Sequence, residues 1–332
     1  MRLTDKYGRV HKYLRLSLTD KCNLRCIYCN PDSDSENCSN RDSYLTIEEY
    51  ERLVRIFVLG FGFEKVRLTG GEPFARKNVT QLITRLGKIK EDKHFELTAT
   101  TNGTLISSTL ISLKAAGLDR LNFSLDSLDS DNFNNITGRT HLGKVLAAIE
   151  EAEDTGFSPI KINTVIMRGK NDHEILDFMK YAVKTRRNIR FIEYMPFSGN
   201  LYSDDMFMSA AEIKDEVKKQ YKLHKIENSK SLVAKDFLID GTKAAVSFIS
   251  SISEHFCDGC DRLRITADGK MKTCLFSVDK SETDLRVLLR ENKSDFEIME
   301  SIITSLQNKT KVHPDLHELK LFQNNDMLKI GG

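Results

Sequence analysis

The segment LRLSLTDKCNLRCIYC, residues 14–29, joins an alternating apolar run to a group of cysteines. Leu14, Leu16 and Leu18 alternate with polar residues, which is the period of a β-strand that buries one face. Three cysteines follow in the spacing C-x3-C-x2-C. The segment therefore predicts a strand that leads into a cysteine-rich loop.

Strands and helices alternate from this strand to about residue 195. Thr46 and Glu49 form a capping-box pattern ahead of a helical apolar stripe that ends near Gly60. Further strands are predicted at 66–69, 95–100, 121–125, 160–166 and 189–194, with helices near 79–86, 109–116, 143–153 and 173–185. This alternation gives six βα-type units and indicates an α/β fold with a parallel sheet.

Six units fit either an open doubly wound sheet or a partial barrel. No Gly-x-Gly-x-x-Gly motif follows the first strand, which weakens the dinucleotide-binding version of the open sheet. Because ligands of parallel α/β folds bind at the C-terminal strand ends, we expect the site there. Polar residues stand at or near several of these ends: Thr69, Thr100, Asp126 and Glu193.

The pattern of the chain changes after about residue 200. A charged helix at 211–219 resembles a surface connector, and a strand is predicted at 244–252. We therefore predict a barrel-like domain over residues 1–205. A smaller C-terminal domain over residues 206–332 is predicted to close the mouth of the barrel.

The composition is that of a globular chain without a strong electrostatic field. The 332 residues include 50 Lys and Arg against 48 Asp and Glu, for a formal net charge of +2. This balance argues against nucleic acid or a membrane as a partner, so an anion site must come from local basic clusters. Charges recur near the N-terminus and no apolar run approaches the ~18 residues of a membrane helix, so we expect a cytoplasmic protein. With seven cysteines and no secretory signal, metal ligation explains the cysteines better than disulfides do.

Cys22, Cys26 and Cys29 are spaced for an iron–sulfur cluster. Three thiolates on a tight loop can bind three irons of a [4Fe–4S] cubane and leave the fourth iron open. An open iron can bind the amino and carboxylate groups of S-adenosylmethionine (SAM) and pass it an electron. The alternative is a structural zinc site, which needs four ligands, and Cys38 is the nearby candidate for the fourth. Cys38 lies in a polar loop, and we interpret it as a bystander.

Cys257, Cys260 and Cys274 form a second triplet with the spacing C-x2-C-x13-C. Three thiolates again leave one iron of a cubane open, and that iron could bind a substrate. The alternative is a zinc ribbon completed by His255 or by a distant ligand.

Two arginines follow the second cysteine of this triplet. Arg262 and Arg264 stand at alternate positions, so on an extended segment both side chains point the same way. Arginine forks suit phosphate or the edge of a purine. The pair therefore favours a nucleotide near the second triplet.

The first triplet resembles the signature of the radical SAM superfamily, including the aromatic residue before its third cysteine. Gly70-Gly71-Glu72-Pro73, at the end of the next predicted strand, matches the motif with which that superfamily binds the SAM amino group. The resemblance implies a partial (βα)6-type TIM-like barrel whose smaller C-terminal domain carries the second cluster. It also implies SAM contacts by Tyr28, Gly71, Ser124 and Met195.

Over nearly its whole length the chain resembles the GTP 3′,8-cyclase family of molybdenum cofactor biosynthesis. The match includes LRLSLTD (14–20), RLTGGEP (67–73), TTNG (100–103), RFIEYM (190–195), the second triplet with both arginines, and the terminal IGG (330–332). The resemblance implies a radical SAM lyase with two [4Fe–4S] clusters. Such an enzyme converts GTP to (8S)-3′,8-cyclo-7,8-dihydroguanosine 5′-triphosphate.

The resemblance also implies which residues bind GTP. It places the guanine on the open iron of the second cluster. The implied GTP contacts are Arg15, Lys65, Arg67, Thr100, Lys161, Arg190, Arg262 and Arg264. Of these, we expect Arg15, Arg262 and Arg264 to lie nearest the chemistry.

The terminal Gly331-Gly332 has two main interpretations, a frayed tail or a tail that reaches into the active site as in the family. A diglycine end also occurs in proteins adenylated for sulfur transfer. The family further implies a low-potential electron donor and a downstream pterin-forming enzyme as partners. The oligomeric state stays open, with a homodimer as one option.

Two other functions stay open at this point. One is a different radical SAM enzyme with an auxiliary cluster, such as a peptide-modifying enzyme, although such enzymes usually carry more than three C-terminal cysteines. The other is a non-enzymatic interaction module stabilised by zinc or an iron–sulfur cluster. Metal content distinguishes a zinc module from both enzymes.

Overall fold

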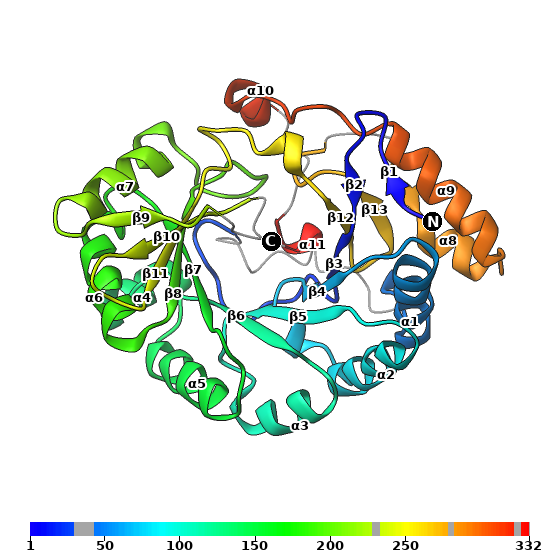
Figure 1. Cartoon of the computed structure of the whole chain (residues 1–332), viewed down its shortest axis with the longest axis horizontal. Coiled ribbons are helices and arrows are strands. Elements are labelled where there is room, and N and C mark those ends of the chain that lie inside the picture. Colours follow the sequence, from blue (N-terminus) through cyan, green and yellow to red (C-terminus); the bar gives the residue numbers. More distant parts are fainter. Residues whose placement is uncertain (30–42, 228–232, 278–281, 322–326, 332) are drawn as a thin grey trace.

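The structure is a computed structural model that describes residues 1–29, 43–227, 233–277, 282–321 and 327–331. A curved sheet surrounds its centre, with helices on the outer side (Figure 1). The six predicted strands are present and neighbour one another in chain order: β3 (Tyr13–Ser17), β4 (Lys65–Thr69), β5 (Glu96–Thr101), β6 (Arg120–Ser124), β7 (Lys161–Ile166) and β8 (Asn188–Glu193). Each neighbouring pair is parallel, as the alternation predicts.

Five helices of these units begin within two residues of the predicted positions, whereas the helix at Ser130–Thr137 was not predicted. The predicted capping box is present, because the N–H of Glu49 donates to Thr46 Oγ1 (3.2 Å) and the N–H of Thr46 donates to the Glu49 carboxylate (2.7 Å). The first helix continues into a π-helical turn at Ile56–Gly60 and so reaches the predicted end. The helices of this half are α1 (Ile47–Arg55), α2 (Val79–Asp92), α3 (Leu110–Ala115), α4 (Ser130–Thr137), α5 (Leu142–Asp154) and α6 (Ile175–Thr185).

Residues after 205 enlarge the same sheet at both edges. β11 (Ala245–Ile249) pairs in parallel with β8 and is followed outward by the antiparallel β10 (Lys235–Ile239) and β9 (Leu223–Lys225). At the other edge, β12 (Arg262–Ile265) pairs in parallel with β3 and is followed by the antiparallel β13 (Lys270–Lys272) and β14 (Thr283–Asp284). The strands β3 to β14 therefore form one open arc of 12 strands with β14 and β9 at its edges, which confirms the partial barrel. The division into domains at residue 205 stays a prediction.

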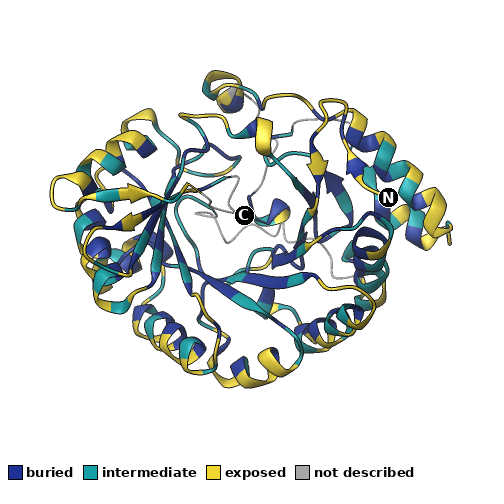
Figure 2. Ribbon diagram, viewed as in Figure 1, coloured by how far each residue is buried: buried dark blue, intermediate teal, exposed yellow. Residues whose placement is uncertain are grey.

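The alternation along the strands separates an apolar outer face from a polar interior. Leu14, Leu16, Val66 and Leu68 are fully buried in the layer between strands and helices. Figure 2 shows the same division on the helices, which are buried toward the sheet and exposed outward. In a complete TIM barrel the inward-facing side chains are bulky and fill the interior. Here many are charged or amidic, and the interior holds a cavity of about 990 Å³.

Both ends of the chain are anchored to this frame. The hairpin of β1 (Leu3–Thr4) and β2 (Val10–His11) carries a buried Arg9, whose guanidinium donates to the carbonyl oxygens of Cys257 (2.9 Å) and Thr310 (2.8 Å).

The remaining helices are α7 (Ala210–Lys218), α8 (Leu285–Arg290), α9 (Asp295–Gln307), α10 (Leu316–Leu321) and α11 (Met327–Ile330). The last of these lies at the centre of the ring (Figure 1). Within the described ranges, every helix is too short or too polar to cross a membrane.

Candidate active site

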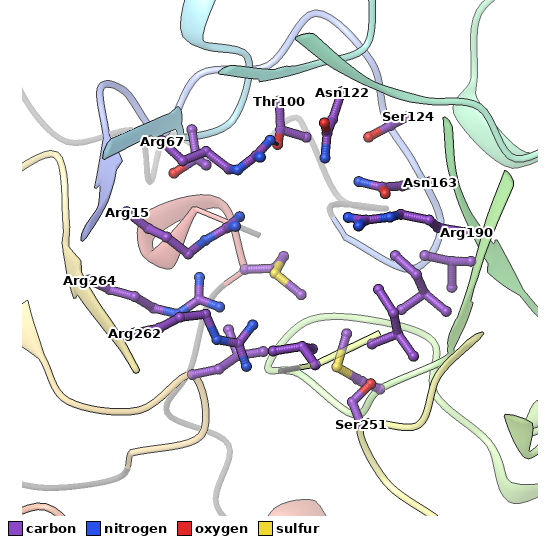
Figure 3. Close-up of a pocket in the computed structure, with 18 of the residues that line it drawn as sticks. Arg15, Arg67, Thr100, Asn122, Ser124, Asn163, Arg190, Ser251, Arg262 and Arg264 are labelled. Atoms are coloured by element: carbon purple, nitrogen blue, oxygen red, sulfur yellow. Dashed lines mark hydrogen bonds between the residues drawn. The ribbon is translucent and has the colours of Figure 1, made fainter. Parts of the chain in front are cut away.

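All the residues predicted to bind a cluster, SAM or GTP line the central cavity. Glu193, which was noted at a strand end, does not line it; its carboxylate accepts hydrogen bonds from the N–H groups of Ala210 (2.7 Å) and Ile252 (2.7 Å). Figure 3 shows labelled side chains from strands around the whole wall pointing inward. The lining includes the six cysteines Cys22, Cys26, Cys29, Cys257, Cys260 and Cys274, the expected SAM contacts Tyr28, Gly71, Ser124 and Met195, and the expected GTP contacts Arg15, Lys65, Arg67, Thr100, Lys161, Arg190, Arg262 and Arg264. The fold thus gathers residues from positions 15 to 274 at one site, while their individual roles stay predictions.

The two cysteine triplets lie at opposite ends of this cavity. Cys22 follows the end of β3, whereas Cys260 precedes the start of β12. Because β12 pairs in parallel with β3, these positions are at opposite ends of the strands. A strand of this length at about 3.3 Å per residue separates its ends by about 15 Å. The structure therefore corrects the expectation of a site at the C-terminal strand ends alone, because the unfilled interior extends the site to the N-terminal ends.

The triplets fit a multi-iron cluster better than a single metal ion. All six thiols are free of disulfides. A tetrahedral zinc ion with Zn–S bonds of about 2.3 Å would hold its sulfurs about 3.8 Å apart. Among the described residues, however, the one trio of potential ligand atoms within 4.8 Å of one another is His255, Cys257 and His313, which contains a single cysteine. The three sulfur atoms of a triplet are therefore not all within 4.8 Å of one another, which is further apart than one zinc ion would hold them. This spacing suits a cubane in which each of three irons binds one thiolate.

The surroundings of the first triplet suit thiolates bound to a cation. The N–H of Leu24 lies 3.5 Å from Cys22 Sγ, and Nδ2 of Asn102 lies 3.8 Å from the same sulfur. Burial raises the pKa of Cys22 to about 11 and the pKa of Cys26 well above its usual value. Free thiols here would stay protonated at neutral pH, so a bound metal group is needed to hold them as thiolates.

The strand register places cations in rows across one wall. Arg264, Arg15 and Arg67 are in register on three adjacent strands. Arg262 and Lys65 occupy the next row, two residues toward the N-terminal strand ends. Burial lowers the pKa of Arg15 to about 10, and the charges of Arg67 and Arg262 act in the same direction. Burial likewise lowers the pKa of Arg264 well below its usual value, with the charges of Arg15 and Arg262 contributing.

A second group of polar residues lies on the facing wall, on β7 and β8 (Figure 3). Asn163 and Arg190 are in register on these strands. Burial lowers the pKa of Lys161 to about 8, and the charge of Arg190 adds to the shift. Asn163 Oδ1 and Arg190 Nε are buried without a hydrogen-bond partner in the part of the chain that the structure describes. Such atoms on a cavity wall are suited to a polar ligand that completes their hydrogen bonds.

The cavity lining therefore carries uncompensated positive charge. Glu96 pairs with Lys65, which neutralises one cation. Arg67, Arg262 and Arg264 form no ion pair within 4.0 Å with a carboxylate of the described residues. Buried guanidinium groups without counter-ions favour a polyanion with several oxygen acceptors, such as a triphosphate.

Tyr13 is a cavity residue that the sequence analysis did not select. Its hydroxyl accepts hydrogen bonds from Arg67 Nε (2.5 Å) and Arg15 Nη1 (3.2 Å), and Lys65 Nζ lies 5.4 Å from its ring centroid. Burial alone would raise the pKa of this phenol, but the three positive charges lower it to about 7. Tyr13 stands two residues before Arg15 on the same strand face. The alternation of side chains along a strand could therefore have identified Tyr13 as a cavity residue.

Three of the polar side chains labelled in Figure 3 point into the cavity without having been predicted. Asn122 stands two residues before Ser124, and Asn163 stands two residues after Lys161. The same period of two could have identified both. Ser251 follows β11, and no feature of the sequence marks it as a site residue.

The Gly-Gly-Glu-Pro motif holds the first cysteine loop against β4. The N–H of Gly71 donates to the carbonyl oxygen of Thr19 (2.7 Å), and the N–H of Glu72 donates to that of Lys21 (2.8 Å). A Cβ atom on Gly71 would lie 2.4 Å from the Lys21 oxygen, so no larger residue fits. The close approach that this glycine permits is therefore to the loop backbone, and its contact with SAM stays a prediction.

Two of the expected SAM residues, Tyr28 and Met195, are linked to each other through Asn200. The Tyr28 hydroxyl donates to Asp126 Oδ2 (2.7 Å). Asn200 Nδ2 donates to the backbone oxygens of Tyr28 (3.1 Å) and Met195 (2.8 Å). Asn200 thus joins two of the four expected contacts, although no pattern in the sequence singled it out.

The C-terminal tail enters the barrel. Arg264 Nη1 donates to the carbonyl oxygen of Gly331 (2.7 Å), which is buried. Gly331 has a φ of 72°, and a Cβ atom there would lie 2.4 Å from Thr69 Oγ1. The interpretation of a frayed tail is therefore wrong for Gly331. Gly332 and Cys38 lie outside the described residues.

The chain matches two family models. The model described as "Radical SAM superfamily" matches residues 16–182, and the model described as "Molybdenum Cofactor Synthesis C" matches residues 187–314. The chain is also 41% identical over 331 residues to "GTP 3′,8-cyclase, mitochondrial" of Arabidopsis thaliana, which covers 99% of this chain and 83% of that protein.

Two further comparisons extend this result. The chain is 43% identical over 333 residues to "Molybdenum cofactor biosynthesis protein 1" of Dictyostelium discoideum, covering 99% of this chain and 52% of that protein. The chain therefore spans about half the length of this relative. Among solved structures, Streptococcus suis SuiB bound to S-adenosylmethionine superposes with a TM-score of 0.64 at 16% identity, over 98% of this chain and 73% of that chain. This likeness shows the shared fold.

Proposed function

Because the chain belongs to the radical SAM superfamily and, within it, to the GTP 3′,8-cyclase family, we propose that it converts GTP to (8S)-3′,8-cyclo-7,8-dihydroguanosine 5′-triphosphate. This reaction is an early step of molybdenum cofactor biosynthesis. One observation carries the proposal: a single cavity has three free thiols at each end and buried guanidinium groups between them. The family relation also decides against a non-enzymatic interaction module.

The cysteines are proposed to hold two [4Fe–4S] clusters, the first on Cys22, Cys26 and Cys29 and the second on Cys257, Cys260 and Cys274. The first cluster, when bound, supplies the electron that cleaves SAM into methionine and the radical that starts the reaction. The expected SAM residues lie at the same end of the cavity as the first triplet, which supports this assignment.

The side chains of the wall are proposed to bind and orient GTP. The sheet holds the guanidinium groups of adjacent strands in fixed positions. They can therefore bind the triphosphate with little loss of side-chain conformational entropy. A walled cavity also excludes water from a reactive radical. Arg15, Arg262 and Arg264 are the proposed residues nearest the reacting atoms, and they share one wall.

The stoichiometry requires an electron donor. The product is an isomer of GTP, in which the C3′–H bond has broken and a C3′–C8 bond has formed. The hydrogen atom lost from C3′ leaves with the deoxyadenosyl group, so an electron and a proton must enter the purine. A low-potential electron donor is therefore a proposed partner, as is an enzyme that converts the cyclised nucleotide to a pterin. The cytoplasmic location and a homodimer stay predictions.

The proposal is tested with protein reconstituted with iron and sulfide under anaerobic conditions. Incubation with dithionite, SAM and GTP is expected to give 5′-deoxyadenosine and loss of GTP, together with the cyclised product. UTP and a reaction without nucleotide are the controls. Deoxyadenosine formed equally with and without GTP would remove GTP as the substrate, and no deoxyadenosine from an iron-replete protein would overturn the proposed mechanism.

The affinity for GTP is expected to fall as the pH rises from 6 to 9. Above its pKa of about 7, Tyr13 becomes an anion among the cations of the wall, and above its pKa of about 8, Lys161 loses its charge. Both changes reduce the positive potential that holds a triphosphate, so both weaken binding in the same direction. Isothermal titration with GTP at a series of pH values measures this fall.

The variant Tyr13→Phe separates the effect of Tyr13 ionisation on GTP affinity from the effect of Lys161 deprotonation. It is expected to lose the part of the decline centred near pH 7 and to retain the part near pH 8, because Lys161 is unchanged. A decline of the same shape and midpoint in Tyr13→Phe and the unmodified protein would contradict the assignment to Tyr13.

A further inference from the structure

Lys309 is a buried lysine beside the second cysteine triplet. It follows the end of α9, and 3% of the residue is exposed. Its Nζ atom lies 3.9 Å from Cys260 Sγ and also donates to the carbonyl oxygen of Thr273, the residue before Cys274. Lys309 is not among the residues that line the cavity. It therefore contacts a cysteine of the triplet without lining the cavity proposed to hold GTP.

The charges around Lys309 do not include a carboxylate partner. Among the described residues, no ion pair within 4.0 Å joins it to Asp or Glu. Its neighbours include three basic groups, Arg9 and His11 of the N-terminal hairpin and Arg262 of β12. The groups that favour its charge are the sulfurs of Cys260 and Cys274. A buried ammonium is costly without a negative partner, so its partner must be the sulfur site itself.

A rigid connection holds Lys309 in place. The guanidinium of Arg9 donates to the carbonyl oxygens of Cys257 (2.9 Å), Thr310 (2.8 Å) and Lys311 (2.9 Å). Arg9 Nε also donates to Asp5 Oδ2 (2.6 Å), which fixes its orientation. The hairpin therefore ties the segment that carries Lys309 to the loop that carries Cys257.

We propose that Lys309 is a positioning residue of the second cluster, whose ammonium is the buried counter-charge and sulfur hydrogen-bond donor of that cluster. The inference rests on the proposed function, because it takes Cys257, Cys260 and Cys274 as the cluster ligands. Three thiolates outweigh the positive charge of the cluster core, so the assembly is an anion and each added electron makes it more negative. A fixed cation nearby stabilises the reduced state more than the oxidised state. Lys309 therefore raises the reduction potential of the second cluster and strengthens its retention.

The test uses full-length protein in which Cys22→Ala, Cys26→Ala and Cys29→Ala leave the second triplet as the proposed cluster site. Into this background we place Lys309→Met, which removes the charge, and Lys309→Arg, which keeps it. Lys311→Met is the matched control, because the side chain of Lys311 is exposed two residues away. Iron and sulfide content and the midpoint potential from an EPR-monitored redox titration are measured without SAM or GTP.

We expect Lys309→Met to lower the midpoint potential or to lose iron, with Lys309→Arg and Lys311→Met close to the background protein. An iron-replete Lys309→Met protein with an unchanged potential would overturn the inference. Loss of the cluster in both Lys309→Met and Lys309→Arg would also overturn it, because the requirement would then be for the shape of lysine and not for its charge. Failure of the background protein to assemble any second cluster would instead overturn the proposed cofactor assignment, and the inference with it.

Discussion

Cys26→Ala is expected to abolish 5′-deoxyadenosine formation, whereas Cys260→Ala is expected to retain deoxyadenosine formation at the level that the unmodified protein shows without GTP and to lose the cyclised product. The reason is the separation of the two triplets, which lie at opposite ends of the parallel strands β3 and β12. SAM cleavage depends on the proposed first cluster, and GTP placement depends on the proposed second cluster. Deoxyadenosine and cyclised nucleotide are quantified together by liquid chromatography and mass spectrometry after anaerobic reconstitution.

The size of each effect distinguishes the two sites. For Cys26→Ala both products should fall below detection. For Cys260→Ala the cyclised product should fall by about 10²-fold or more, because a misplacement of the reactants by about 1 Å already costs about that much. Cys38→Ala is the control, since Cys38 is interpreted as a bystander, and it should keep both activities. Complete loss of deoxyadenosine in a folded Cys260→Ala protein would contradict independent roles for the two ends of the cavity.

Gly331→Ala is expected to lower cyclised-product formation by about 10-fold to 10²-fold. A methyl group at this position would lie 2.4 Å from Thr69 Oγ1, and the φ of 72° is unfavourable for alanine. The tail would have to move, and the hydrogen bond from Arg264 Nη1 to the Gly331 oxygen (2.7 Å) would be lost. Arg264 would then lose the contact that orients it in the row with Arg15.

Steady-state assays of product formation check this prediction, with far-UV circular dichroism to verify the fold. Gly143→Ala is a matched control, because its methyl group would meet open space and its backbone is not in the left-handed region. It should behave like the unmodified protein. Equal activity of Gly331→Ala and Gly143→Ala would show that the buried tail does not support the site.

The predicted strands and helices are found because the local pattern and the tertiary environment agree. Leu14, Leu16 and Leu18 alternate in the sequence and are fully buried on one side of the chain. The capping box of Thr46 and Glu49 forms because both partners are within one helical turn. Interactions over three or four residues need no knowledge of distant segments, so such elements can be predicted from the chain alone.

Other site residues were missed for an equally physical reason. Tyr13 becomes a candidate only when Arg67 and Lys65, on the neighbouring strand, are brought beside it. Lys309 is one lysine among 50 basic residues until the fold buries it against Cys260. Their significance comes from contacts between residues 49 to 54 positions apart in the sequence, which no local pattern records.

The sequence indicated the chemistry, partly through local patterns and partly through its resemblance to the radical SAM and GTP 3′,8-cyclase families. Thiol spacing, the glycine motif and the arginine pair are local, and the ligand chemistry of cysteine and arginine does not depend on the fold around them. Tertiary structure decided where that chemistry takes place. The parallel pairing of β12 with β3 puts the triplets at opposite ends of one cavity, and the hydrogen bond from Arg264 holds the buried Gly331 inside the barrel. Such pairings depend on backbone hydrogen bonds and packing between segments about 250 residues apart, and only the folded chain brings those segments together.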